Sequence, residues 1–142
     1  MIISVTSWAF YAIALLLKAY ANRVRFMAFP DMPLAFSRSS RFASRFWLTR
    51  LAITYGSLAG LWFAHGAWVF GGAFVFYFLF SAITFAAGSR KSVNKWARVN
   101  LEVQRQEATA RGENFDEHAG WLQALRSGER LVEQNIARNG NL

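Results

Sequence analysis

Two histidines and a small group of carboxylates are the residues of this chain with the most obvious chemistry. His65 stands inside a long uncharged stretch, where it could ligate haem or contact a quinone. A haem site would need a second histidine from another span or another chain, but the only other histidine, His118, lies in the polar C-terminal part. We therefore interpret His65 as a polar residue at a turn near a membrane surface, and His118 as a solvated side chain. The sequence leaves open whether His65 contacts a cofactor held by another protein.

The carboxylates of Glu113, Asp116 and Glu117 form a dense acidic cluster. Asp116 and Glu117 suit the first turn of a helix, whose N-terminus attracts negative charge, so we expect capping rather than metal binding. The chain has no cysteine, which excludes thiolate nucleophiles and cysteine-ligated metals. It also lacks a Gly-rich phosphate loop, an HExxH motif and a nucleophile elbow. The sequence therefore predicts a protein that is not an enzyme and has no metal or cofactor.

The element that has to position His65 is an uncharged stretch of 39 residues, Leu51–Ser89. A bilayer core is about 30 Å thick, and about 20 helical residues cross it once. As one helix the stretch would be about 58 Å long, which is nearly two crossings. We therefore predict a helical hairpin that enters the membrane and returns to the same side. Its turn is marked by Trp62, His65, Gly66 and Trp68.

A second apolar stretch, Ile2–Ala21, carries no charge before Lys18. Its length also fits a secretory signal peptide. However, it lacks the basic segment with which such peptides begin, and Lys18 stands where their apolar core should continue. We favour a retained transmembrane helix over a cleaved signal.

Together these stretches predict an all-α integral membrane protein with three transmembrane helices. The expected membrane domain, residues 1–88, has spans at 2–21, 48–65 and 68–88 and a basic connection at 22–47. Lysine and arginine favour the cytoplasmic side of a membrane, so the prediction is N-terminus outside and C-terminus inside, with residues 89–142 as a helical extramembrane tail. The two expected belts of interfacial aromatics are Trp8, Trp62 and Trp68 on one side, and Tyr20, Trp47 and Trp96 on the other.

The net charge of +8 could indicate nucleic-acid binding, but the positions of the charges favour topology, and we expect no nucleic-acid partner. Pro30 and Pro33 interrupt the basic connection. After them, Leu34–Arg50 can form a helix in the headgroup plane; a solvated loop is the alternative. A structural anionic lipid is the one bound group for which the sequence offers ligands. The residues expected to contact it are Arg38, Arg41, Arg45, Arg50, Arg90 and Lys91.

Small residues spaced by four predict close helix packing. Gly56, Gly60 and Ala64 share one helical face, and such faces let helices approach closely in lipid, where packing replaces the hydrophobic drive. We expect Gly72 and Ala73 to provide the facing groove.

The tail is predicted to form two helices. The stripe Val93–Val103 continues the third span outward. Residues 112–120 interrupt it, and a second helix starts near Asn114 or Asp116. The stripe of that helix is Phe115, Leu122, Leu125, Val132 and Ile136. Two short amphipathic helices bury little surface against each other, so we expect a partner protein to cover this stripe.

The predicted spans contain no acid, and Lys18 and His65 map to their ends, so they offer no evident path for protons or ions. We expect a non-catalytic accessory subunit of a larger membrane complex, and look first to respiratory-chain complexes and ATP synthase. These reside in energy-transducing inner membranes (mitochondrial inner or bacterial plasma membrane), and the tail would face the matrix or cytoplasm. The expected partners are membrane lipids, other integral membrane subunits and a protein that binds the tail. The alternative is a small holin-like pore-forming protein; a membrane-bound nucleic-acid binder is a third class.

Overall fold

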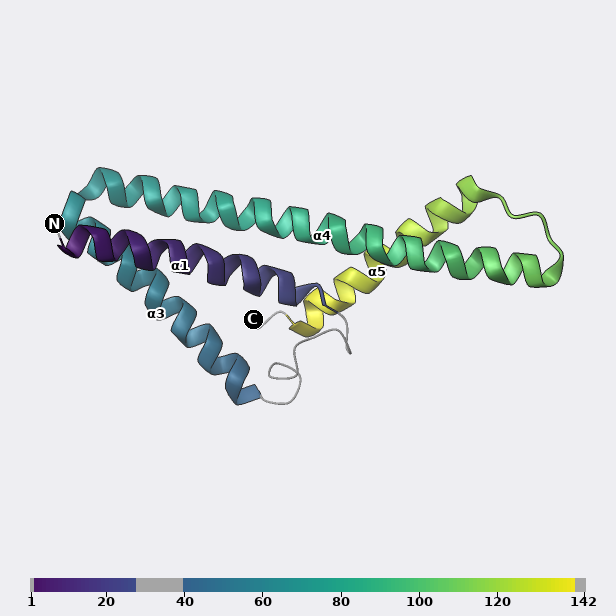
Figure 1. Cartoon of the computed structure of the whole chain (residues 1–142), viewed down its shortest axis with the longest axis horizontal. Helices are drawn as coiled ribbons and strands as arrows, with labels where there is room; N and C mark the ends of the chain where they lie inside the picture. The colour runs from purple at the N-terminus through teal and green to yellow at the C-terminus, as the bar shows by residue number, and fades with distance from the viewer. Residues whose placement is uncertain (1, 28–39, 140–142) are drawn as a thin grey trace.

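The computed structural model describes residues 2–27 and 40–139, and every regular element in these two ranges is a helix (Figure 1). In chain order the helices are α1 (Ile2–Arg25), α3 (Ser40–His65), α4 (Ala67–Arg111) and α5 (Glu117–Asn139). The all-helical class predicted from the sequence is confirmed for this part of the chain.

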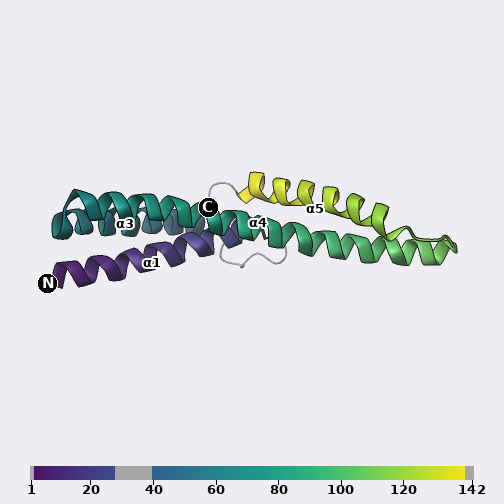
Figure 2. The ribbon, with the colours of Figure 1, turned by 90° about the horizontal axis from the view of Figure 1, so that it is seen from above.

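The helices form a bundle at one end of the molecule and a long hairpin at the other. α1 runs along the first half of α4 in the same direction, and α3 packs against α1 in the opposite direction (Figure 1). α5 folds back beside the second half of α4, as the view from above also shows (Figure 2). The molecule is therefore long and narrow, and its N-terminus lies at the end where α3 turns into α4.

A single residue reverses the chain between α3 and α4. α3 ends at His65 and α4 begins at Ala67. Between them, Gly66 has φ 80° and ψ −174°, a conformation that residues with a side chain rarely adopt. The predicted hairpin turn is therefore confirmed.

α4 is one continuous helix of 45 residues, about 68 Å long. It joins the predicted third span to the first predicted tail helix without a break. Gly112, in the left-handed region at φ 71°, ends it, and the Asp116 carboxylate then accepts the N–H groups of His118 (2.9 Å) and Ala119 (3.2 Å) at the start of α5. The predicted interruption and the capping role of Asp116 are confirmed.

α3 differs from its prediction. The sequence predicted a separate interfacial helix, Leu34–Arg50, ahead of a span starting near residue 48, whereas one helix runs from Ser40 to His65. Neither proline nor glycine stands between residues 40 and 55, so nothing in the chain interrupts the helical hydrogen bonds there. The prediction of a helix ending at Arg50 is therefore wrong, while Pro30, Pro33 and residues 34–39 lie outside the described residues.

Two of the helices, α1 and α4, are long and apolar enough to cross a membrane. Their most apolar 18-residue windows are only 17% and 6% buried within the chain, whereas the core helix of a soluble protein is mostly buried. α3 does not reach the same apolar content.

Candidate functional site

Three polar side chains of α3 are buried in the interior of the bundle beside Leu58 and Leu61, while several of its large apolar side chains face outward. Arg50, Thr54 and Ser57 are only 3–5% exposed, whereas Tyr55 is 63% and Phe63 85% exposed. The hydroxyls of Thr54 and Ser57 donate to backbone carbonyls of their own helix, each at 2.8 Å, so burying them leaves no hydroxyl donor unsatisfied. An amphipathic helix in water would keep such polar side chains exposed and Tyr55 and Phe63 buried.

Hydrogen bonds from polar side chains of α1 also fix this helix against α4 at two positions along its length. Near the turn, the Tyr11 hydroxyl donates to the Ala73 carbonyl at 2.6 Å. Toward the other end, the amide of Asn22, which is 1% exposed, donates to the Ser81 carbonyl (3.1 Å) and the Thr84 hydroxyl (2.8 Å). The register of the two helices is thereby set.

Beyond Asn22, a cleft between α1 and α4 collects basic side chains, and we name it the cationic cleft. Arg23 of α1 and Lys91 and Lys95 of α4 line it, together with the hydroxyl residues Thr84 and Ser92. The rest of its lining is apolar or aromatic: Ala19, Phe26, Met27, Ala87, Gly88 and Trp96.

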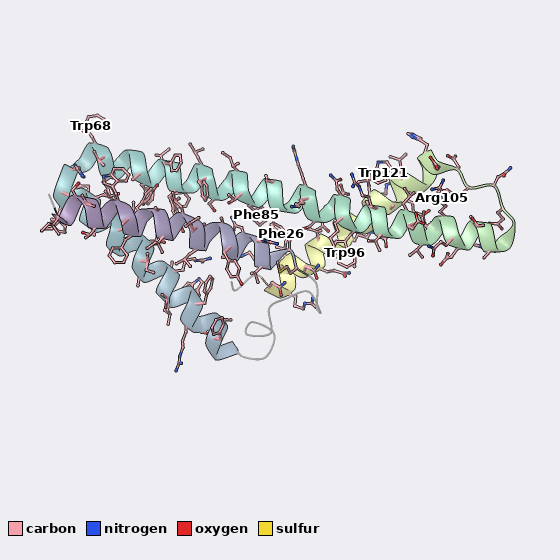
Figure 3. The ribbon with its side chains drawn as sticks, viewed as in Figure 1. Phe26, Trp68, Phe85, Trp96, Arg105 and Trp121 are labelled. Atoms are coloured by element: carbon pink, nitrogen blue, oxygen red, sulfur yellow. The ribbon has the colours of Figure 1, made fainter. Side chains whose placement is uncertain are left out.

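The Phe26 ring forms a fixed wall of the cationic cleft. It is 3% exposed and packs on Phe85 with 5.0 Å between ring centroids (Figure 3). It lies so close to Gly88 that a Cβ there would stand 2.7 Å from Phe26 Cε2. Trp96 lies further along α4, and the Lys95 ammonium is 5.7 Å from its ring centroid.

The cationic cleft lies in the most basic part of the chain. Eleven of the sixteen basic residues precede Glu102, but only one of the eight acids does. Among the described residues, neither Arg23 nor Lys91 forms an ion pair. An anion bound in the cleft could therefore neutralise the positive charges of Arg23 and Lys91.

Of the six basic residues predicted to contact lipid, only Lys91 lines the cationic cleft. Arg50 is buried in the bundle, and Arg45 and Arg90 are exposed outside the cleft. Two predicted side chains lie outside what the structure describes, those of Arg38 and Arg41.

The sequence prediction did not include Arg23 and Lys95 among the lipid ligands. They come together only because Asn22 and Phe26 fix α1 against α4, and that register has no signal in a single sequence. The one local hint is that residues 84, 88, 91 and 95 follow one another at steps of three and four, which places them on one helical face.

Of the four predicted packing residues, Gly60 is the one for which a close neighbour on another helix is found. An added Cβ there would overlap the Ser7 hydroxyl on α1 and stand 3.2 Å from Ser7 Cβ. The sequence predicted the facing groove at Gly72 and Ala73. Gly60 instead faces α1, while Ala73 is buried in the same cluster as Leu58 and Leu61 of α3. Gly56, Ala64 and Gly72 are exposed, and their role in packing against other proteins stays a prediction.

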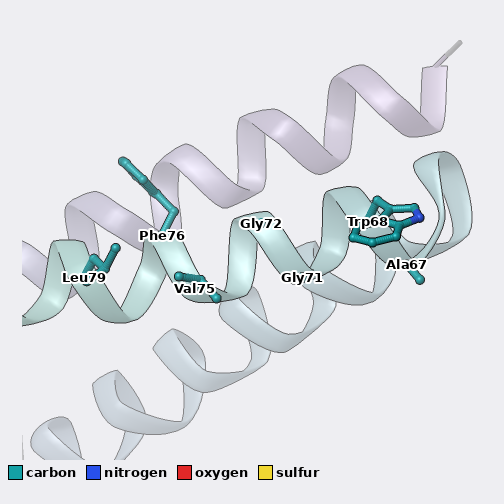
Figure 4. Close-up of a pocket in the computed structure, with 7 residues that line it drawn as sticks. All are labelled: Ala67, Trp68, Gly71, Gly72, Val75, Phe76 and Leu79. Atoms are coloured by element: carbon teal, nitrogen blue, oxygen red, sulfur yellow. The ribbon is translucent and has the colours of Figure 1, made fainter.

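An open apolar groove runs along the outer face of α4 near the turn (Figure 4). Gly71 and Gly72 leave its floor without side chains, and Trp68, 94% exposed, stands at one end. Its remaining lining is also apolar: Ala67, Val75, Phe76 and Leu79.

His65 and Glu117, two of the residues considered for chemistry, have structural partners. Nε2 of His65 is hydrogen-bonded to the Ser4 hydroxyl at 2.7 Å, which ties the start of α1 to the end of α3. Glu117 pairs with Arg105 at 3.1 Å. Within residues 2–27 and 40–139, no three His, Asp or Glu side chains form a group that could hold a metal ion.

α5 packs on α4 through small residues that the predicted stripe did not include. Ala97 and Ala124 are fully buried, and a Cβ on Gly128 would stand 2.8 Å from the Val93 carbonyl oxygen. Of the predicted stripe, Val132 is buried whereas Leu122 is 48% exposed, and the covering of the stripe by a partner protein stays a prediction. The small residues recur every four positions, so the two backbones approach closely.

The far end of α5 returns to α1. The side-chain amide of Asn139 donates to the carbonyls of Arg25 (3.3 Å) and Met27 (3.1 Å). Carbonyls at a helix C-terminus have no partner within the helix, so Asn139 caps α1 and anchors the tail to the bundle.

No protein-family model matches this chain, and comparisons with curated proteins and with solved structures give no significant match.

Proposed function

We propose that this chain is a three-span membrane protein, with its N-terminus outside and its C-terminus inside, that serves as a non-catalytic accessory subunit of a larger membrane complex. The observation that carries the membrane placement is the apolar outer surface of the bundle, which surrounds a core that includes polar side chains. In water this arrangement would expose Phe63 and Trp68 while burying Arg50 and Asn22, which is unfavourable on both counts. In lipid the same arrangement is favourable, and it extends to α3, the least apolar of the three spans.

The distribution of charge supports the proposed orientation. The basic residues of α1, α3 and α4 lie at the end of the bundle away from the turn, and the turn end has no charged side chain from Leu51 to Ser89. Trp8 lies against His65 at the turn end, with 6.3 Å between ring centroids, whereas Tyr20 lies against Phe46 toward the basic end, at 6.0 Å. This is the pattern of a bilayer with its positive side on the cytoplasmic face.

The tail supports the accessory role. Acyl chains can cover the apolar groove of α4, so that groove does not by itself require a protein partner. The hairpin of α5 and residues 89–111 of α4 extends about 34 Å beyond the bundle, where no acyl chain can reach. There Val99 and Val103 are 47% and 48% exposed, and adjacent exposed apolar side chains are typical of a contact surface.

The test is purification of the full chain in mild detergent from its native membrane, followed by a native gel and mass spectrometry of the associated proteins. Respiratory-chain complexes and ATP synthase are the first assemblies to examine, because they contain many small membrane subunits. We expect the chain to migrate with a large complex. Val99→Glu with Val103→Glu should release it, because two charges would enter the contact surface.

The matched control is Gln106→Glu with Gln123→Glu, which adds the same charge at exposed polar positions and should leave the complex intact. A single species of the mass of this chain alone would contradict the accessory role. Permeabilisation of the membrane on expression of this chain alone would favour the holin-like alternative instead.

A further inference from the structure

We propose that the cationic cleft binds the phosphate headgroup of one anionic phospholipid. Arg23, Lys91 and Lys95 surround the phosphate, and the acyl chains lie along the apolar lining. This inference rests on the membrane placement proposed above. It adds that the bundle binds one anionic lipid specifically, at the cationic cleft.

The polar groups of the cleft match a phosphate. A guanidinium can bind two phosphate oxygens at once, and an ammonium adds a mobile point charge. The Thr84 hydroxyl donates to the Phe80 and Ser81 carbonyls, at 2.9 and 3.1 Å, and is therefore occupied. Ser92 is then the hydroxyl that can donate to the ligand.

The order of the lining residues along α4 favours a lipid over a free phosphate ion. Ala87 and Gly88 belong to the uncharged stretch, while Lys91 and Lys95 follow one and two turns beyond it. A phospholipid has the same order, with apolar chains below its phosphate. Trp96 stands at the polar end of the cleft, where an indole suits the membrane interface.

The cleft differs from the rest of the basic surface because its charges come from two helices that are fixed against each other. The hydrogen bond from Asn22 to Thr84 and the contact of Phe26 with Phe85 hold Arg23 of α1 opposite the lysines of α4. Residues 40–101 contain no acid, and among the described residues neither Arg23 nor Lys91 forms an ion pair.

The experiment is native mass spectrometry of the full chain in detergent, titrated with phosphatidylglycerol and, separately, with neutral phosphatidylcholine. We expect one phosphatidylglycerol to bind in preference to phosphatidylcholine. In Lys91→Gln/Lys95→Gln its affinity should fall about 25-fold, or about fivefold per cation, since a basic residue near an anionic headgroup contributes about 1 kcal/mol.

The matched control is Arg45→Gln/Arg90→Gln, which removes the same charge from exposed residues outside the cleft and should change the affinity less than about twofold. Equal losses in the two double variants would overturn the proposal, because they would show only general attraction to the basic surface.

A second variant, Ala87→Phe, keeps every cation and fills the apolar part of the cleft. It should also weaken phosphatidylglycerol binding, and inorganic phosphate at millimolar concentration should not displace the lipid. Displacement by phosphate, with no effect of Ala87→Phe, would overturn the proposal in favour of a free-anion site. If the chain did not insert into phosphatidylcholine vesicles, the membrane placement itself would fail, whereas insertion without lipid preference would defeat only this inference.

Discussion

Glycine at position 60 determines how closely α3 approaches α1. An added Cβ at this position meets the Ser7 side chain, and Ser7 is itself 7% exposed and hydrogen-bonded to the Ile3 carbonyl at 2.7 Å. The Ser7 side chain therefore has little room to move away. In lipid, such close contact is a main source of helix association.

Gly60→Leu should lower the stability of the bundle by about 1–3 kcal/mol, the usual cost of overpacking. The measurement is the thermal unfolding midpoint in detergent, followed by tryptophan fluorescence. Gly56→Leu is the control: it lies one turn earlier on the same helix, and an added Cβ there has no atom within 4 Å. A similar loss in both variants would show that Ser7 does not limit the approach.

At the residue scale, local chemistry predicted the turn at Gly66 and the cap at Asp116, because each depends on neighbouring residues in the chain. Contacts between helices were less predictable. The sequence predicts Gly60 as a packing residue, but its neighbours were expected at Gly72 and Ala73, whereas the residue that an added Cβ would meet is Ser7. A single sequence records which residues are small, but not the register in which two helices meet.

At the scale of the elements, the α4–α5 hairpin is held by backbone proximity more than by large side chains. Ala97, Ala124 and Gly128 leave no side chain to separate the helices, so main-chain atoms of α4 lie next to α5. The stripe predicted from the sequence contains the leucines of α5, because hydrophobic periodicity weights large residues, and it was assigned to a partner protein rather than to α4. The small residues that recur every four positions form the actual contact.

Gly128→Val should open the hairpin, although valine has the higher intrinsic helix propensity of the two. Its Cβ would meet the Val93 carbonyl and the Ala97 nitrogen, which are backbone atoms that cannot rotate away. We expect amide hydrogen exchange across residues 120–139 to accelerate at least tenfold, equivalent to about 1.4 kcal/mol. Ala137→Val, at an exposed position of the same helix, should leave exchange nearly unchanged; if it had the same effect, the backbone contact would not be the cause.

At the scale of the whole molecule, the ends of the uncharged stretch should lie on one side of the membrane and the turn on the other. Because the chain has no cysteine, single cysteines report accessibility without background. A membrane-impermeant maleimide applied from outside should label Ala67→Cys and should leave Ala110→Cys unlabelled until the membrane is opened. Labelling of both from the same side would contradict the three-span arrangement.

The overall architecture was the most predictable level. The length of the uncharged stretch predicted a hairpin, and the structure has one. The prediction of an interfacial helix that ends at Arg50 is wrong, because the change from basic to uncharged residues there does not mark the end of a helix. A helix continues through such a change, because its backbone hydrogen bonds do not depend on what its side chains face.

The cap that Asn139 places on α1 joins residues that are 114 and 112 positions apart. A ribosome makes the carbonyls of Arg25 and Met27 early, and makes Asn139 only after the two later helices of the bundle and most of α5. The last turn of α1 therefore lacks this partner until α3, α4 and most of α5 have been synthesised.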